Sequence, residues 1–375
     1  MPTRISEVPI RSDRGWKIVN TASETTLLAA AEVFVVDGGH QGILRERIKD
    51  EAKLTGTRYS ADSLQLDQVV INLRTKEELR NQSWILAPIA QFNQMVAIDR
   101  DEIEEFRSIQ RLIRGYWHND NEKKPLSIGV YGPPGSGKSF GIQQIVKTIE
   151  KSPMFLEFNL AQFSKPEDLI DALLKVSSET SKGAKPIAFF DEFDCTFGDE
   201  KLGWLRYFLS PMQDGKIFLK NTEHNIGRAI FVFAGGTASS YREFARETPN
   251  GRTTEVHNQF VLAKGPDFVS RLSGHINILG INRRDEKDQS YVLRRARIMR
   301  THLVGRNLVG KTCRTVVDPV FLRKLLQVGK YKHGARSITK TIDMCIGDGG
   351  VLYLPPAEQL SMHVDESDVG ELLKP

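Results

Sequence analysis

Residues 132–139 read Gly-Pro-Pro-Gly-Ser-Gly-Lys-Ser, and these residue types at this spacing could hold a nucleotide phosphate. Glycines let the backbone curl so that its N–H groups point inward at phosphate oxygens. Lys138 would neutralise the β- and γ-phosphates, and Ser139 would ligate Mg²⁺. We therefore predict a nucleotide site formed by Gly132, Pro133, Pro134, Gly135, Ser136, Gly137, Lys138, Ser139 and Phe140.

A second stretch, residues 187–194 (IAFFDEFD), is an apolar run that ends in carboxylates. Asp191 would hold Mg²⁺ through water, and Glu192 would orient and deprotonate the attacking water. The alternative is a strand that ends in a solvated acidic turn, which would be the commoner case if the phosphate loop were not upstream. Because the glutamate positions water rather than an acceptor hydroxyl, the pair favours hydrolysis over transfer to a small molecule.

Both stretches need rigid elements to position them. An apolar run precedes the phosphate loop and a helical apolar pattern follows it, so that a helix N-terminus would face the phosphate. Short apolar strands then alternate with helices, which indicates a parallel sheet with helices on both faces. The expected strands are residues 126–131, 154–158, 187–190, 229–233 and 276–279, and a charged amphipathic helix is expected at 98–117.

The pattern along the chain predicts an α/β fold class in three domains. These are a small N-terminal α/β domain at residues 1–95, an αβα P-loop core at 96–281, and a helical lid with a C-terminal tail at 282–375. In the lid, helical patterns cover residues 288–304 and 318–328, and a third begins near residue 335.

In the N-terminal domain, the pattern predicts a strand ending at Val36, a glycine turn, a helix from Gly42 and a second strand at 66–73. Residues 35–42 (VVDGGHQG) could bind a ligand at the glycine turn. We favour an ordinary strand-to-helix turn, because the segment completes no binding motif.

Composition excludes several classes of protein. The net charge of +5 is small for 375 residues and does not by itself indicate nucleic-acid binding. Cys195, Cys313 and Cys345 are far apart, which is neither a disulfide framework nor a zinc site and suits a reducing cytosol. The N-terminus has no apolar signal core, and residues 27–36 are too short to span a bilayer. We therefore expect a cytoplasmic protein that does not enter a membrane.

The phosphate loop GPPGSGKS and the stretch FFDE together resemble the AAA+ ATPases, and three further stretches resemble the Clp unfoldase clade in particular. The resemblance covers residues 98–350. It implies an ATPase that binds ATP and Mg²⁺ and assembles into a ring, expected to be a hexamer, that remodels an unidentified protein client.

The first of these stretches is residues 209–237, in which a helix ends in Asp214-Gly215 and a strand then leads to Thr237. The resemblance makes Thr237 the best match for the sensor-1 residue, a polar side chain that touches the γ-phosphate and the attacking water. The insertion of Gly235-Gly236 leaves an ordinary Ser/Thr turn as the alternative.

The other two stretches each supply an arginine. Residues 265–278 (GPDFVSRLSGHINI) resemble the segment that carries the arginine finger, which makes Arg271 a contact to the ATP of the neighbouring subunit. Residues 331–343 (YKHGARSITKTID) resemble the sensor-2 segment, which makes Arg336 a contact to the γ-phosphate in the same subunit. The alternatives are a helix-end arginine paired with a surface acid and a basic residue in a first helical turn, where the helix dipole disfavours it.

The chain departs from the Clp pattern where a pore loop would lie. Residues 159–178 carry Phe163 as their single aromatic and no aromatic-glycine motif, so we do not expect a motor that threads polypeptides. Two alternatives stay open: a nucleotide-dependent switch or scaffold with a sensing N-terminal domain, and an AAA+ machine that acts on nucleic acid.

The nucleic-acid alternative rests on a basic segment, residues 281–314. Arg294, Arg295, Arg297 and Arg300 are expected mostly away from the packed face of its helix. We favour a solvated lid helix over a phosphate-contacting one, because no stacking aromatics are interleaved with the arginines.

Overall fold

The computed structural model describes residues 16–18, 68–73, 83–88, 90–219, 222–245, 255–286, 288, 290–306, 308, 319–346 and 355–373. Two compact units divide the chain. One comprises Met1–Gln91, Val96–Arg100 and Gly280–Pro375, and the other comprises Phe92–Met95 and Asp101–Leu279. The first unit thus groups N-terminal strands with the helices after Gly280, which the sequence assigned to separate domains.

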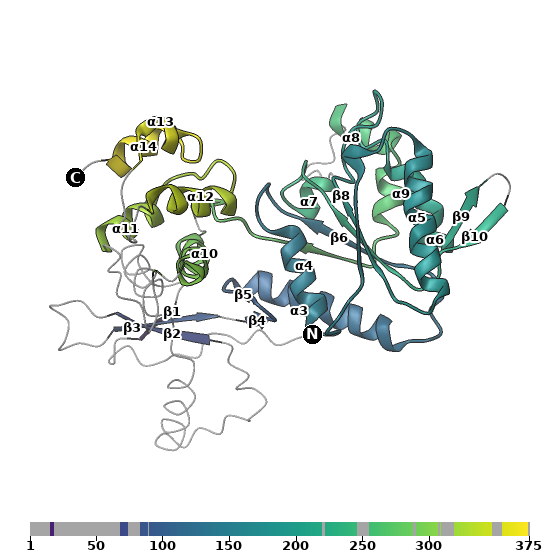
Figure 1. Ribbon diagram of the computed structural model, residues 1–375, viewed down its shortest axis with the longest axis horizontal. Coiled ribbons are helices and arrows are strands. Elements are labelled where there is room, and N and C mark those ends of the chain that lie inside the picture. The colour runs from purple at the N-terminus through teal and green to yellow at the C-terminus, as the bar shows by residue number, and fades with distance from the viewer. Residues whose placement is uncertain are drawn as a thin grey trace, which may run out of the picture. The chain divides into compact units, whose positions relative to one another are not determined.

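The second unit is built on a five-stranded sheet in which every pairing is parallel (Figure 1). The strand order is β12-β6-β11-β8-β7. Residues of β6, β8 and β11 are buried on both faces of the sheet, which explains why these strands are largely apolar. The predicted parallel sheet is confirmed, with strands β6 (Leu126–Tyr131), β7 (Phe155–Asn159), β8 (Ile187–Asp191), β11 (Ile230–Ala234) and β12 (Gly274–Asn277).

The register of the central strands places their carboxyl ends side by side. In β11, Ala234 lies opposite Val130 of β6 on one side and opposite Asp191 of β8 on the other. The loops that follow these three strands therefore leave the same edge of the sheet, which is where α/β folds bind ligands.

Helices cover both faces of this sheet. Figure 1 shows α3 (Arg100–His118) and α4 (Lys138–Lys147) on one side, and α5 (Pro166–Ser181), α6 (Leu205–Asp214) and α9 (Gly265–Val269) on the other. The face under α5, α6 and α9 holds an aromatic core, in which rings from the strands pack with rings from the helices. The predicted αβα layering is confirmed.

Several short elements of this part of the chain were not predicted. The hairpin β9 (Lys216–Leu219) and β10 (Thr222–Asn225) is antiparallel and projects beyond α6 in Figure 1. A second two-stranded sheet, β4 (Ala90–Phe92) with β5 (Met95–Ala97), precedes α3. The remaining elements are the 3-10 turn η3 (Leu160–Gln162) and the helices α7 (Tyr241–Phe244) and α8 (Glu255–Leu262).

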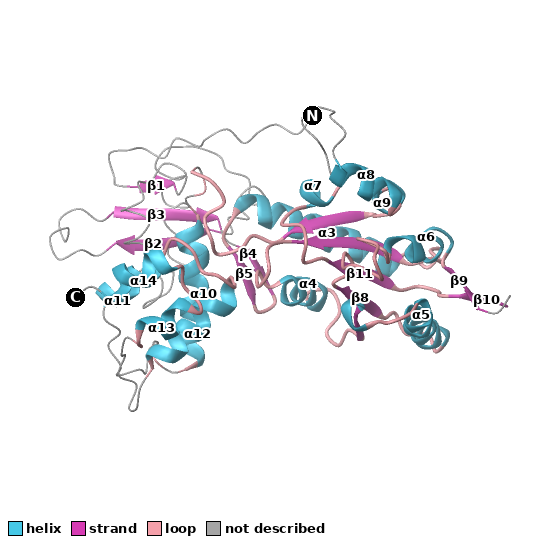
Figure 2. Ribbon diagram, turned by 90° about the horizontal axis from the view of Figure 1, so that it is seen from above, coloured by secondary structure: helices cyan, strands magenta, loops and turns pink. Residues whose placement is uncertain are grey.

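The first unit contains a three-stranded sheet and five helices among its described residues (Figure 2). The sheet order is β1-β3-β2, with β1 (Trp16–Ile18), β2 (Gln68–Leu73) and β3 (Ser83–Pro88). The predicted strand at 66–73 is confirmed as β2, whereas the predicted strand, turn and helix around Val36 and Gly42 lie outside the described residues.

The predicted helical character of the residues after 281 is confirmed. The helices are α10 (Tyr291–Gly305), α11 (Pro319–Gln327), α12 (Ala335–Cys345), α13 (Ala357–Ser361) and α14 (Glu366–Leu373). They share one apolar cluster, to which α10, α11, α12 and α14 all contribute buried side chains.

Two arginines of α10 lie inside this unit, so the prediction that the basic residues of this helix lie mostly away from the packed face is wrong for them. Arg294 is 3% exposed and donates to Asp288 at 2.6 Å. Arg295 is fully buried, lies over the rings of Tyr291 and Tyr331, and donates to backbone carbonyls at the end of α11. A helix end leaves carbonyls without intrahelical partners, and Arg295 supplies the missing donors.

Candidate nucleotide site

The phosphate loop connects the end of β6 to the start of α4, as predicted. Gly132, Gly135 and Gly137 have φ angles of 153°, 72° and 91°, a region that favours glycine. At Gly132 a Cβ would lie 2.5 Å from the carbonyl oxygen of Ile278, which follows β12. The glycine at position 132 therefore allows the loop to lie directly against the neighbouring strand's end.

Polar atoms of this loop fit a bound phosphate. The Lys138 ammonium donates to the carbonyl oxygens of Gly132 at 2.9 Å and Pro133 at 3.4 Å, so it lies over the loop. Among the described residues, the Oγ of Ser136 is buried and has no hydrogen-bond partner. A buried hydroxyl without a partner is costly, and a phosphate oxygen in the loop would satisfy it. The first N–H groups of α4 also lack partners within the helix.

The acidic pair lies where the sequence placed it, at the carboxyl end of β8. Asp191 is the last residue of the strand, and the next residue, Glu192, has a φ of 53°. A positive φ is uncommon for a residue with a side chain and is typical of functional sites. The strained backbone turns the chain sharply as it leaves the sheet.

The environment of Glu192 favours a proton acceptor that titrates above its usual range. Partial burial raises the pKa of Glu192 above its usual value of 4.5, and the charges of Asp194 and Asp191 raise it further. Lys138 acts in the opposite direction, because its positive charge stabilises the carboxylate. The base predicted from one motif is thus electrostatically coupled to the lysine predicted from the other.

The Gly235–Thr237 loop, which follows β11, contacts the acidic segment. Its two backbone N–H groups at Gly236 and Thr237 donate to Asp194 at 3.0 and 2.9 Å, and the Thr237 hydroxyl also donates to Asp194. A Cβ at Gly235 would lie 2.5 Å from the Asp194 carboxylate, and one at Gly236 would lie 2.7 Å from that of Glu192. The inserted glycines therefore make room for two carboxylates.

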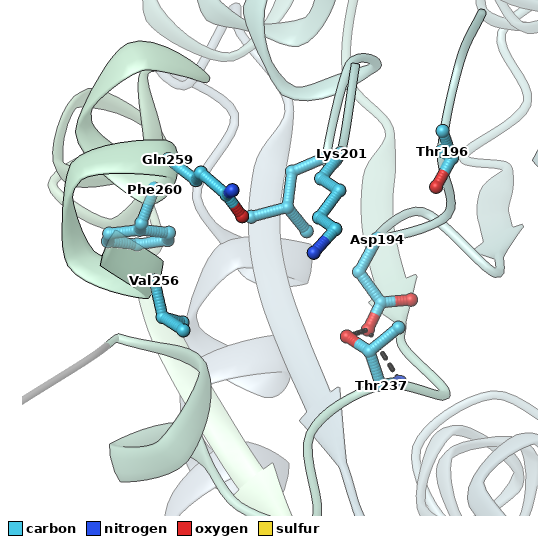
Figure 3. Close-up of a pocket in the computed structure, with 8 residues that line it drawn as sticks. Asp194, Thr196, Lys201, Thr237, Val256, Gln259 and Phe260 are labelled. Atoms are coloured by element: carbon cyan, nitrogen blue, oxygen red, sulfur yellow. Dashed lines mark hydrogen bonds between the residues drawn. The ribbon is translucent and has the colours of Figure 1, made fainter. Parts of the chain in front are cut away.

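A pocket of about 240 Å³ opens beside this loop (Figure 3). Figure 3 shows the side chains of Asp194 and Thr237 joined by hydrogen bonds, with Lys201 pointing toward them. Asp194 was not predicted as a functional residue, although it lies three residues after Asp191 in the same acidic run.

Two glutamates of α3 were also missed. Glu105 accepts hydrogen bonds from the backbone N–H and side-chain amide of Asn277, the last residue of β12. Glu102, which is buried, accepts from the backbone N–H of Leu279. Together they fix the strand end against which the phosphate loop packs. The sequence signal that could have identified Glu102 is an acidic residue among the apolar positions of the predicted amphipathic helix.

Arg271, the predicted arginine finger, lies just after α9. Its guanidinium donates to the carbonyl oxygen of Asp267 and to the Ser270 hydroxyl, and it lies 3.8 Å from the Asp267 carboxylate. Its side chain is 23% exposed. The arginine thus contacts its own helix in this structure, and its predicted role toward a neighbouring subunit stays a prediction.

Arg336 and Phe140 are placed as follows. Arg336 is exposed in the first turn of α12 and belongs to the other compact unit, so the structure describes it within that unit alone. Phe140 lies in the first turn of α4 and is 48% exposed. Their predicted contacts to nucleotide stay predictions.

The predicted Mg²⁺ ligands are compatible with the structure. Ser139 lies in the first turn of α4 and Asp191 at the end of β8. Mg²⁺ in nucleotide sites is held by one or two protein groups together with phosphates and water. No cluster of three or more His, Cys, Asp or Glu side chains that could hold a metal is present in the described part of the chain.

No helix among the described residues is long and apolar enough to cross a bilayer.

Comparison with known proteins gives one family match. Residues 128–234 match the family described as ATPase family associated with various cellular activities (AAA). No curated protein matches the chain.

Two solved structures are similar to this chain at 13% identity. The ORC2 protein of Aeropyrum pernix, in ADPNP–ADP complexes, has a TM-score of 0.45 and covers 73% of this chain and 68% of its own. The FIGL-1 AAA domain in complex with ADP has a TM-score of 0.41 and covers 73% of this chain and 80% of its own. Likeness at this level carries no argument about function. The parallel sheet with helices on both faces shows an α/β P-loop NTPase core, and residues 128–234 of that core are similar to the AAA ATPase family.

Proposed function

We propose that this protein is an AAA+ ATPase of the cytoplasm that hydrolyses ATP with Mg²⁺ in a hexameric ring. In this proposal it remodels a protein partner held by the N-terminal domain. The Clp-like segments around Asp214, Arg271 and Arg336 support placing it near the Clp clade of the family.

One observation carries the ATPase proposal. Lys138 of the phosphate loop and Glu192 of the acidic pair come from motifs far apart in sequence, yet their charges interact in the structure. A cation for the phosphates and a base with a raised pKa at the same edge of a sheet are the two groups that ATP hydrolysis requires.

Each of these residues would have a separate role in ATP hydrolysis. The phosphate loop and the N-terminus of α4 bind the phosphates, and Lys138 exchanges its loop carbonyls for phosphate oxygens. Glu192 accepts a proton from the attacking water, whose oxygen bonds to the γ-phosphorus as the bond to the β-phosphate oxygen breaks. Ser139 and Asp191 would hold Mg²⁺, which neutralises the developing charge.

Two arginines complete the proposed site. Arg336 would contact the γ-phosphate from the same subunit. Arg271 would release Asp267 and reach the ATP of the neighbouring subunit, where a planar guanidinium suits charge on the transferred phosphoryl group. The ring is proposed because this contact requires a second copy of the chain.

Purified protein with ATP tests the proposal. We expect hydrolysis that requires Mg²⁺, stops on chelation, and is lost together with ATP affinity in Lys138→Ala. Lys147→Ala, which changes the last residue of α4, is the matched control and keeps both. Absence of ATPase activity in the assembled wild-type protein contradicts the proposal.

A switch or scaffold is the second candidate, and one observation favours it. Phe163, the single aromatic of the segment where a pore loop would lie, packs against Trp204 with ring centroids 5.9 Å apart. An aromatic side chain that packs against Trp204 in this way is not presented to a client protein. Turnover well below one per minute combined with strong ATP-dependent partner binding would favour the switch, and rapid turnover stimulated by an unfolded client would favour remodelling.

The nucleic-acid alternative has less support. Arg294 and Arg295 contact groups inside their own unit and are buried, so they are not available to phosphates. If DNA or RNA stimulated the ATPase activity, and if this stimulation fell steeply with increasing salt, the result would favour this alternative.

A further inference from the structure

The Asp194 carboxylate holds the Gly235–Thr237 loop through three hydrogen bonds. One oxygen accepts the N–H of Gly236. The other accepts both the N–H and the hydroxyl of Thr237 (Figure 3). Asp194 is 3% exposed, whereas Thr237 is exposed at the edge of the sheet. A buried carboxylate on one loop thus fixes an exposed hydroxyl on another.

The hydrogen bond from the Thr237 hydroxyl to Asp194 limits which further hydrogen bonds this hydroxyl can make. A threonine hydroxyl has one proton to donate and two lone pairs that accept. An ionised carboxylate only accepts, so the proton of Thr237 is directed at Asp194. The oxygen of Thr237 then presents lone pairs alone to its surroundings, and these repel an anionic phosphate oxygen but accept a hydrogen bond from water.

The same loop also contacts the proposed base. Gly236 lies against the Glu192 carboxylate so closely that a Cβ there would lie 2.7 Å from its oxygen. Thr237 is the next residue, and β11 lies between the strands that lead to Lys138 and to Glu192. The short segment that carries Thr237 therefore also contacts Glu192.

We infer that Asp194 is a positioning residue that turns the Thr237 hydroxyl into an acceptor for the attacking water. This inference rests on the proposed ATPase function. Of the two hydrogens of that water, one hydrogen-bonds to Thr237 and stays on the product phosphate. The other is transferred to Glu192 as the oxygen bonds to the γ-phosphorus and ADP leaves.

Substitution of Thr237 tests this role. Thr237→Ser keeps the hydroxyl and should keep kcat nearly unchanged, whereas Thr237→Val should lower kcat by about 100-fold, in the range of losing one positioned hydrogen bond. The ratio of affinities for a non-hydrolysable ATP analogue and for ADP should not change in Thr237→Val, because the inference gives Thr237 no contact to the γ-phosphate. Thr196→Val, at an exposed hydroxyl that lines the same pocket, is the control and should leave kcat unchanged.

Asp194→Asn supplies a readout that a purely structural role would not give. Asp194→Asn should lower kcat while the KM for ATP stays within a few-fold, because Asp194 orients Thr237 through hydrogen bonds and is given no contact to a phosphate. A melting temperature measured on each variant separates these effects from loss of the fold.

The outcomes are distinguishable. A selective loss of ATP-analogue affinity over ADP affinity in Thr237→Val would show that Thr237 donates to the γ-phosphate, and it would overturn the inference. So would an unchanged kcat in Thr237→Val. Either result leaves the ATPase proposal standing, whereas a wild-type protein without ATPase activity overturns the proposed function itself.

Discussion

Glu192 combines a strained backbone with a perturbed carboxyl group. Its φ of 53° and its position beside Asp191 and Asp194 both cost free energy in the folded protein. The cost is understandable if the group accepts a proton from water near neutral pH, for which a raised pKa is an advantage.

The first prediction concerns pH. Burial raises the pKa of Glu192 above 4.5, with Asp194 and Asp191 adding to the shift. A base works only when deprotonated, so kcat should fall as the pH is lowered through this raised pKa, and the acid limb should lie above pH 4.5. A kcat profile measured over the pH range in which the protein stays folded checks this. An acid limb at or below 4.5 would contradict the assignment of Glu192 as the base.

The second prediction concerns the inserted glycines. Gly236→Ala should push the new methyl group against the Glu192 carboxylate and lower kcat by about tenfold or more, because small displacements of catalytic groups are costly. Nucleotide affinity should stay within a few-fold, since the phosphate loop is untouched. Gly115→Ala on α3, where a Cβ meets nothing within 4 Å, is the matched control. Equal activity of the two variants would count against the close approach.

At the scale of elements, the order of strands explains why distant residues meet. Because β11 pairs with both β6 and β8, the loop after it lies between the phosphate loop and the acidic pair. Glu102 and Glu105 of α3 hold the end of β12 through hydrogen bonds, and Gly132 packs against Ile278, the residue that follows this strand. The site is therefore a property of the sheet edge rather than of any one loop.

The third prediction concerns the α10 helix. Asp288→Ala leaves the buried Arg294 without its closest acidic partner, which should cost about 3–5 kcal/mol of unfolding free energy. Glu286→Ala, at an exposed position nearby, should change it by less than about 0.5 kcal/mol. Denaturant unfolding of the two variants measures the difference, and a similar small effect in both would show that the pair contributes little.

The same pair gives a pH dependence. Burial alone would raise the pKa of Asp288, but hydrogen bonds and charges from Arg294 and Arg284 hold it well below its usual value of 3.8. The unfolded state therefore takes up a proton first as the pH falls. The stabilisation is fully present above this usual value and is lost at lower pH. Asp288→Ala should accordingly flatten the acid side of the stability profile.

How far the sequence predicts this structure depends on what each element contacts. The five parallel strands were predicted to within two residues at each end. For the central strands β6, β8 and β11, burial on both faces explains the largely apolar sequence. The phosphate loop and acidic pair follow from local spacing. The hairpin β9–β10 pairs two strands of four residues each, which are too short to give a pattern.

The remaining errors come from contacts between segments. Helical periodicity placed Arg294 and Arg295 away from the packed face, but it carries no information about Asp288 or about the carbonyls at the end of α11 that these arginines bind. Asp194 was missed for the same reason, since its role depends on a loop that follows a different strand.

At the scale of the whole molecule, the proposed site draws on more than one subunit. Arg271, which contacts Asp267 of its own helix in this structure, is proposed to act on a neighbour's ATP. ATP bound in such a site would report on assembly as well as supply energy. The account therefore requires that subunits affect one another's activity.

The fourth prediction follows. When Arg271→Ala protein is mixed with wild-type protein, each variant subunit should inactivate the ATP site of a wild-type neighbour. The ATPase activity of the mixture should therefore fall more steeply than the wild-type fraction. Arg206→Ala, which removes an exposed ion pair with Glu200, should have little effect in the same mixture. A linear decrease with Arg271→Ala would show that this arginine does not act between subunits.

The most direct test of the account is ATP binding and ATP turnover measured on one preparation of wild-type protein and one of Glu192→Gln, both with Mg²⁺. Glu192→Gln should bind ATP within a few-fold of wild type and turn it over at least about 100-fold more slowly, as expected for loss of a general base. Turnover of Glu192→Gln at the wild-type rate would contradict it.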